Sequence, residues 1–76
     1  MSANPTVSSR IRSHRRQAGW SQAELSRRSG VGLYTIAKIE QGEIKDPRIS
    51  TVSKLATALG IDISALAPDV TVPVEP

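Results

Sequence analysis

The sequence contains no cysteine, a single histidine and very few aromatic side chains: one tryptophan, one tyrosine and no phenylalanine. Without cysteine the chain has neither disulfides nor thiolate metal ligands. One histidine is also too few for a histidine-rich metal cluster. We therefore predict that the protein holds no metal and no other cofactor.

Long apolar runs are also missing. No stretch approaches the roughly 18 apolar residues that a membrane-spanning helix needs. The first residues, MSANPTVSS, lack the basic segment and apolar run of a signal peptide. We therefore expect a soluble protein of the cytoplasm. Its 76 residues suffice for one small domain, with a core near the lower limit for independent stability.

Acidic residues are scarce in the first part of the chain. Residues 1–50 hold nine Lys and Arg against four Asp and Glu, a net charge of +5. Residues 51–76 hold one Lys against three Asp and Glu, a net charge of −2. A basic amino-terminal part favours a polyanionic partner. From charge alone, a merely solubilising basic surface is an equally good explanation.

The central stretch SQAELSRRSGVGLYTIAKIEQG predicts two short helices joined by a tight turn. Ser21 and Glu24 have the spacing of a capping box, in which each side chain accepts a hydrogen bond from the backbone N–H of the other. Gly30 is placed for a left-handed residue after the first helix. Gly32 precedes a second helix that runs to Gln41. Because the connection is too short for antiparallel helices, we expect a steep crossing, as in a helix-turn-helix.

The flanking segments predict three more helices. A first helix, capped by Thr6 or Ser8, extends to about Ala18. A fourth begins near Ser50, and a short fifth follows Asp62. The predicted fold class is all-α: a compact five-helix domain with the helix-turn-helix at helices 2 and 3.

Residues 1–5 are predicted to be a disordered arm, residues 6–67 the domain, and residues 68–76, with three prolines, a flexible tail. Apolar spacing predicts which side chains of the domain face inward. They are Val7, Ile11, Ala18, Ala23, Leu25, Ile36, Ile39, Ile49, Val52, Leu55, Ala56, Leu59, Ile61, Ile63 and Leu66.

Trp20 is the largest apolar side chain and directly precedes the Ser21 cap. It is placed to pack on Leu25 as a hydrophobic staple and to fill the joint between the first two helices. The alternative is an exposed platform on which a base stacks, although one tryptophan lacks the aromatic repeats of single-strand binders.

Several motifs, taken in their order and spacing, resemble one protein family. They are SSRIRSHRRQAGWSQAEL, the dipeptide GV in the turn, IAKIEQG, the dipeptide PR and LATALGIDISAL. From about Val7 to Leu66 the chain is similar to the lambda-repressor-like, Cro/C1-type (XRE) helix-turn-helix domains, and among them to the phage 434 repressor type. The resemblance implies a five-helix fold that binds double-stranded operator DNA with two half-sites, in most members as a homodimer.

The resemblance also implies residue roles. The residues expected to read bases lie at the start of the third helix: Leu33, Tyr34, Thr35 and Lys38. The residues expected to contact the DNA backbone are Gln22, Gln41, Lys45 and Arg48. Arg15 and Glu40 match a pair that forms a structural salt bridge between the first and third helices.

The sequence departs from the phage repressor type, which carries glutamines where this chain has Leu33, Tyr34 and Lys38. A lysine donates to guanine O6 and N7, and a leucine offers only apolar contact, most naturally with a thymine methyl group. We therefore expect a shared binding mode and a different operator. Asp46 stands where these relatives have an arginine, which predicts a weaker phosphate footprint.

Other interpretations of these residues stay open. Leu33 has a competing use in the core, because it lies three residues before an apolar position. Gln22 could belong only to the capping region of its helix. Lys45 and Arg48 could merely balance the two acids of their loop.

Three functions compete. The first is a DNA-binding transcriptional regulator, a repressor, for which the resemblance implies dimer contacts from the fourth helix and the loop around Thr57 to Ile61. The second is an antitoxin or protein-interaction module whose tail, VTVPVEP, adds a strand to a protein partner. The third is an enzyme, which we do not expect, because His14 stands among arginines with no serine or acid at a catalytic spacing.

Overall fold

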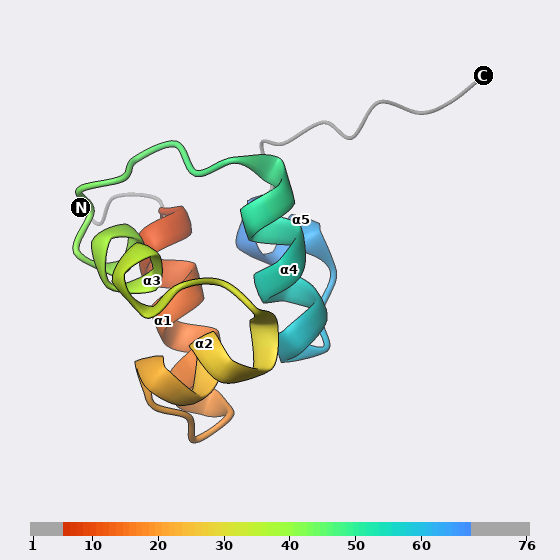
Figure 1. Cartoon of the computed structure of the whole chain (residues 1–76). Helices are drawn as coiled ribbons and strands as arrows, with labels where there is room; N and C mark the ends of the chain where they lie inside the picture. The colour runs from red at the N-terminus through yellow and green to blue at the C-terminus, as the bar shows by residue number, and fades with distance from the viewer. Residues whose placement is uncertain (1–5, 68–76) are drawn as a thin grey trace, which may run out of the picture.

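The computed structural model describes residues 6–67, so the arm and the tail expected at residues 1–5 and 68–76 lie outside the described residues. Five helices follow one another in the chain: Val7–Gln17 (α1), Gln22–Ser29 (α2), Leu33–Glu40 (α3), Ile49–Leu59 (α4) and Ile63–Leu66 (α5). Residues 6–67 contain no strand. The predicted all-α, five-helix class is confirmed (Figure 1).

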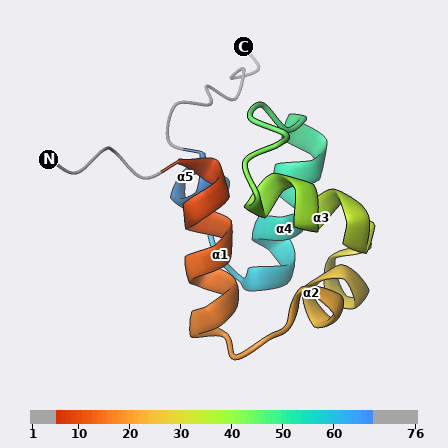
Figure 2. The ribbon, with the colours of Figure 1, turned by 90° about the vertical axis from the view of Figure 1, so that its left-hand side faces the viewer.

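The helix pair α2 and α3 crosses steeply. In Figure 1 α2 is seen from the side and α3 nearly along its axis, whereas Figure 2 shows α3 from the side and α2 nearly end-on. Gly30 ends α2 with a φ of 78°, in the left-handed region, and its N–H donates to the Ser26 carbonyl at 2.9 Å. Gly32 precedes α3, which ends at Glu40, one residue earlier than expected.

The capping box predicted for α2 is only half formed. The Ser21 hydroxyl accepts from the Glu24 N–H at 3.0 Å, as expected. The Glu24 carboxylate does not return the bond, because it pairs with the guanidinium groups of Arg27 and Arg28 one turn further along α2. Charged donors compete well against a single backbone N–H, so the reciprocal half of the prediction is wrong.

The start of α1 carries the complete form of this motif. Thr6 is the cap: its hydroxyl accepts from the Ser9 N–H at 3.1 Å, and the Ser9 hydroxyl accepts from the Thr6 N–H at 3.0 Å. Of the two caps considered from the sequence, the structure has Thr6. The helix ends at Gln17, with Ala18 as its capping residue.

The hydrophobic core lies where all five helices meet. Helix α1 packs against α3, α4 and α5, while α2 packs against α3 and α4. Trp20 is half-buried and packs against this core, as expected for a side chain that fills the joint between α1 and α2. The core residues are Ile11, Leu25, Val31, Ile36, Ile39, Val52, Leu55, Ala56, Leu66 and Ala67. Among residues 6–67, no helix has the length and hydropathy that a membrane crossing requires.

Three predicted inward residues are exposed. Ala18 lies at the capping position of α1, beyond the helix body. Ala23 is two residues before the buried Leu25, and helix positions two apart point to nearly opposite sides. Ile49 opens α4 and is 48% exposed, because the first turn of α4 extends past the core. In the apolar stripe of α4, Val52, Leu55 and Ala56 are therefore buried, and Leu59 is partly buried.

The turn between α2 and α3 gives a first prediction. Gly30 has a positive φ of 78°, where a side chain is strained even though nothing lies within 4 Å of an added Cβ. We expect Gly30→Ala to lower the free energy of unfolding by about 1 kcal/mol, the usual penalty for a non-glycine residue in this region. Thermal or urea unfolding followed by Trp20 fluorescence measures the change.

Gly32→Ala is the matched control in the same turn. Gly32 has a φ of −59°, and an added Cβ meets only the Thr35 hydroxyl, at an ordinary 3.8 Å. Gly32 is the N-cap of α3, where alanine is less favourable than glycine, so Gly32→Ala should cost about 0.5 kcal/mol, less than Gly30→Ala. Equal destabilisation by the two variants would contradict the assignment of strain to Gly30.

Candidate nucleic-acid interface

Helix α3 has one face in the core and one face in solvent. Ile36, Ile39 and Glu40 are buried. Tyr34, on the opposite side, is 73% exposed, and Leu33, which lies one turn before Ile36 at the start of the helix, is 47% exposed. Leu33 is absent from the core cluster, so the structure does not favour the alternative in which it is a core residue. Two large apolar side chains thus face solvent at the start of α3.

Of the two other residues expected to read bases, Thr35 and Lys38 are half-buried on the same helix. The Lys38 ammonium lies 4.6 Å from the centroid of the Tyr34 ring, one helical turn away. A cation within about 6 Å of an aromatic centroid is attracted by the ring. The exposed face of α3 therefore offers a tyrosine and a lysine that contact each other.

Glu40, in the last turn of α3, is the buried charged residue of the described chain, with 2% of its surface exposed. Arg15 of α1 binds it in a bidentate pair, with Nε to Oε2 at 2.7 Å and Nη2 to Oε1 at 2.9 Å. The remaining Nη1 of Arg15 donates to the Trp20 carbonyl at 2.8 Å. This parallel geometry fixes both side-chain planes, so Arg15 links α1, α3 and the segment that leads to α2.

Three more side chains complete this network. Gln22 of α2 donates from Nε2 to Glu40 Oε1 at 3.0 Å, and Arg12 Nε lies 3.7 Å from the same oxygen. The backbone carbonyl of Glu40 accepts from the Ser8 hydroxyl at 2.8 Å and from Arg12 Nη2. Side chains from α1 and α2 therefore converge on the carboxyl end of α3.

Arg12 had no role in the sequence interpretation, and Ser8 was considered only as a possible cap of the first helix. A signal was present, because Ser8, Arg12 and Arg15 are spaced by four and three residues and share one face of α1. Ile11, three residues after Ser8 and four before Arg15, lies beside that face and was itself expected to point inward. Polar periodicity, read together with the expected Arg15–Glu40 pair, would have identified both residues.

Gln22 lies at the first position of α2, where it was expected to contact a phosphate. Its side-chain amide is engaged by Glu40, and the residue is half-buried. The first backbone N–H groups of a helix lack intrahelical acceptors, and the helix dipole favours an anion beside them. The phosphate contact of Gln22 stays a prediction.

The loop between α3 and α4 carries the other residues expected at the DNA backbone. Gln41, Lys45 and Arg48 are all exposed. The loop begins with backbone bonds from the Gly42 N–H to the Ile39 carbonyl at 3.0 Å and from the Glu43 N–H to the Lys38 carbonyl at 2.9 Å. These two bonds are the pair that defines a Schellman motif, so they hold the first residues of the loop against α3.

The loop charges do not neutralise one another. Within residues 6–67 the ion pairs involve the carboxylates of Glu24 and Glu40. Lys45 and Arg48 form none with the acids of their own loop, which disfavours the alternative that they merely balance those acids. Asp46 is exposed in the same loop and opposes their charge.

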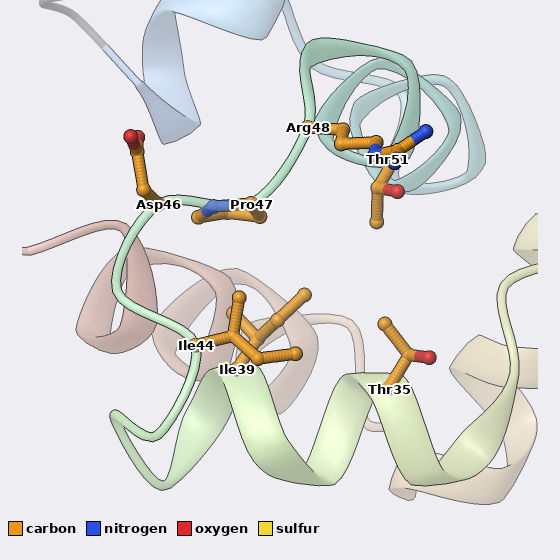
Figure 3. A pocket seen from close by; sticks show the side chains of 7 residues that line it. All are labelled: Thr35, Ile39, Ile44, Asp46, Pro47, Arg48 and Thr51. Carbon is orange, nitrogen blue, oxygen red and sulfur yellow. The ribbon is translucent and has the colours of Figure 1, made fainter.

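An open cavity of about 310 Å³ lies between α3, this loop and the start of α4. Figure 3 shows Thr35 and Thr51 facing each other across it, with Asp46 directed away. Its lining residues are Thr35, Ile39, Ile44, Asp46, Pro47, Arg48 and Thr51. The floor is apolar and the rim carries hydroxyl and guanidinium groups. No group of three or more His, Cys, Asp or Glu side chains within residues 6–67 is placed to hold a metal ion.

Comparison with known proteins agrees with this geometry. The sequence profile of the helix-turn-helix family matches residues 11–66, which is most of the chain. The chain belongs to this helix-turn-helix family, of the Cro/C1 type. Its members are DNA-binding regulatory domains rather than enzymes. The profile covers α2 and α3 entirely and extends from within α1 to the last residue of α5.

An archaeal protein shares part of this sequence. The uncharacterized protein MJ0333 of Methanocaldococcus jannaschii is 51% identical over 35 residues. The match covers 46% of this chain and 36% of MJ0333, so the chain spans only about a third of that relative.

Removal of the Glu40 charge tests the network. Glu40→Gln would leave the Arg15 guanidinium without its buried partner, which costs about 3–5 kcal/mol in comparable sites. We expect a large fall in the midpoint of thermal unfolding. Glu24→Gln is the matched control, since Glu24 also binds two arginines but its side chain is 30% exposed against 2% for Glu40, and it should unfold close to the wild type. A wild-type midpoint for Glu40→Gln would contradict a structural role.

The Glu40 pair also predicts a pH dependence. Burial alone would raise the pKa of Glu40, but hydrogen bonds from Arg15 and Gln22 and the charges of Arg15 and Arg12 outweigh it and hold the pKa below its usual 4.5. As the pH falls, the Glu40 carboxylate is therefore protonated in the unfolded chain at a higher pH than in the folded protein. The stabilisation is complete above about pH 4.5, and it disappears as the pH falls through the lower pKa of the folded state.

Urea unfolding of the wild type and of Glu40→Gln between neutral and acid pH measures this effect. The difference between their free energies of unfolding should stay constant at neutral pH and shrink below the usual carboxyl pKa. A difference that grows with acidity would mean that the folded protein prefers the protonated Glu40.

Proposed function

We propose that this protein is a sequence-specific transcriptional repressor that inserts α3 into the major groove of a two-fold symmetric operator. The observation that carries the proposal is the outer face of α3, where Leu33 and Tyr34 are 47% and 73% exposed while the inner face is fixed in the core. An α-helix fits the major groove, where each base pair presents its own pattern of donors, acceptors and methyl groups. The family assignment supports a DNA partner.

The proposed contacts fall into two groups, one to base edges and one to phosphates. In this proposal Leu33, Tyr34, Thr35 and Lys38 face the base edges. The exposed loop residues Lys45 and Arg48, together with Gln41 and the start of α2, bind phosphates on either side of the groove. Phosphate contacts supply affinity without selectivity, whereas base contacts select the operator.

Dimerisation on DNA is part of the proposal. Two half-sites one helical turn apart, roughly 34–36 Å, place two recognition helices in successive major grooves. Likeness to the phage 434 repressor type points to α4 and the loop Thr57 to Ile61 as the contact between copies. An open groove of about 350 Å³ is lined there by Ile49, Ser53, Ala56, Thr57, Ile61, Asp62 and Ile63. Ile49, which is 48% exposed, would be covered by the second copy in such a dimer.

Selection of duplexes from a randomised DNA pool, at about 150 mM salt so that weak phosphate attraction is screened, tests the proposal. We expect an enriched site with two-fold symmetry. Binding without enrichment, which disappears when salt is raised, would reduce the interaction to phosphate attraction and overturn the proposed function.

Two lysines provide a matched pair of variants on the selected site. Lys38→Ala should weaken binding by about 1–3 kcal/mol and relax the preference at one position of each half-site. Lys54→Ala, an equally charged change at an exposed position of α4 outside the groove proposed between copies, should leave the base preference unchanged. Equal effects of both variants would show that the lysines contribute only net charge.

A further inference from the structure

Tyr34 and Lys38 form a joined pair on the exposed face of α3. They are four residues apart, and the ammonium of Lys38 lies 4.6 Å from the centre of the Tyr34 ring. Tyr34 is nevertheless 73% exposed. The lysine therefore covers one face of the ring at most, while the rest of the ring remains accessible. The Lys38 ammonium, a charged donor, and the apolar Tyr34 ring therefore lie side by side on α3.

This arrangement has a complement in the major groove. Guanine presents N7 and O6 as acceptors for a lysine, and thymine presents an apolar C5-methyl group. The 4.6 Å between ammonium and ring centre is close to the roughly 3.4 Å rise between successive base pairs. A ring edge and an ammonium separated by little more than this rise can reach neighbouring base pairs.

We propose that Tyr34 and Lys38 act as one reading unit for a guanine adjacent to a 5-methylpyrimidine, with the Tyr34 ring positioning the Lys38 ammonium. The inference rests on the proposed function and specifies what the same helix recognises. 5-Methylcytosine carries its methyl group at the same ring position as thymine. A methylated cytosine beside the guanine is therefore bound more tightly than an unmethylated one. Methylation of the DNA at these two neighbouring base pairs therefore alters the affinity of the protein for its site.

Single-atom changes in the DNA test the two contacts separately. Replacing the thymine by uracil removes only the methyl group and should weaken binding about fourfold, as for one lost methylene-sized contact. Methylation of a cytosine at that position should strengthen binding by a similar factor. Replacing the neighbouring guanine by 7-deazaguanine removes N7 and should cost about tenfold, as for a hydrogen bond from a charged donor. Fluorescence polarisation with the selected operator measures each ratio.

Protein variants separate positioning from simple contact. Tyr34→Phe keeps the ring and should retain both DNA sensitivities. Tyr34→Leu keeps an apolar surface without the ring, so it should retain methyl sensitivity and lose most of the 7-deazaguanine effect. Lys38→Ala should lose the 7-deazaguanine effect entirely. Lys45→Ala, in the loop, should weaken binding to all of these duplexes by the same factor.

The outcomes distinguish this inference from the function on which it rests. If methyl and N7 effects fall on base pairs that are not neighbours, or if Tyr34→Leu keeps the full 7-deazaguanine effect, the reading unit is overturned while operator binding stands. If the DNA selection enriches no sequence, the proposed function fails and the inference fails with it. Methyl and N7 effects on neighbouring base pairs, with the N7 effect lost when the Tyr34 ring is removed, support the unit.

Discussion

The buried carboxylate of Glu40 is the constraint on which the arrangement of the first three helices depends. Removing a carboxylate from water costs several kcal/mol unless donors surround it. Here the donors come from Arg15 and Arg12 on α1 and from Gln22 on α2, while the carboxylate belongs to α3. The charge is compensated only when the three helices occupy their native positions together. Its burial therefore penalises every other angle between α3 and the rest of the domain.

This constraint separates stability from recognition within one short helix. An isolated helix of eight residues is not stable in water, so α3 depends on its inner face. That face holds Ile36, Ile39 and Glu40. The outer side chains Leu33 and Tyr34 lie outside the core cluster. Substitutions at these two positions therefore cost little in folding, which leaves them free to vary with the proposed DNA target.

The sequence predicted helix ends better than helix faces. Ends depend on local chemistry: Gly30 and Gly60 stop their helices in the left-handed region with φ values of 78° and 71°. Faces depend on neighbours that are distant in sequence, so Ala23 and Ile49 were placed inward although both are exposed. The capping role of Glu24 failed because two arginines compete for it.

The candidate site was also predictable only in part, because some of its contacts depend on residues that are distant in the sequence. Resemblance identified Arg15 and Glu40, but the bond from Gln22 to Glu40 depends on the relative position of α2 and α3, which no local pattern encodes.

The two parts of the proposed interface differ in how firmly they are held. The base-facing residues stand on α3, whose position is fixed by a buried ion pair and by core packing. The phosphate-facing Lys45 and Arg48 stand on a loop that is tied to α3 near its start and packs on the core through the half-buried Ile44. Fixed groups lose little entropy on binding, whereas loop side chains must be ordered. In the proposed interface the selective contacts would therefore come from the rigid part and the adjustable affinity from the loop.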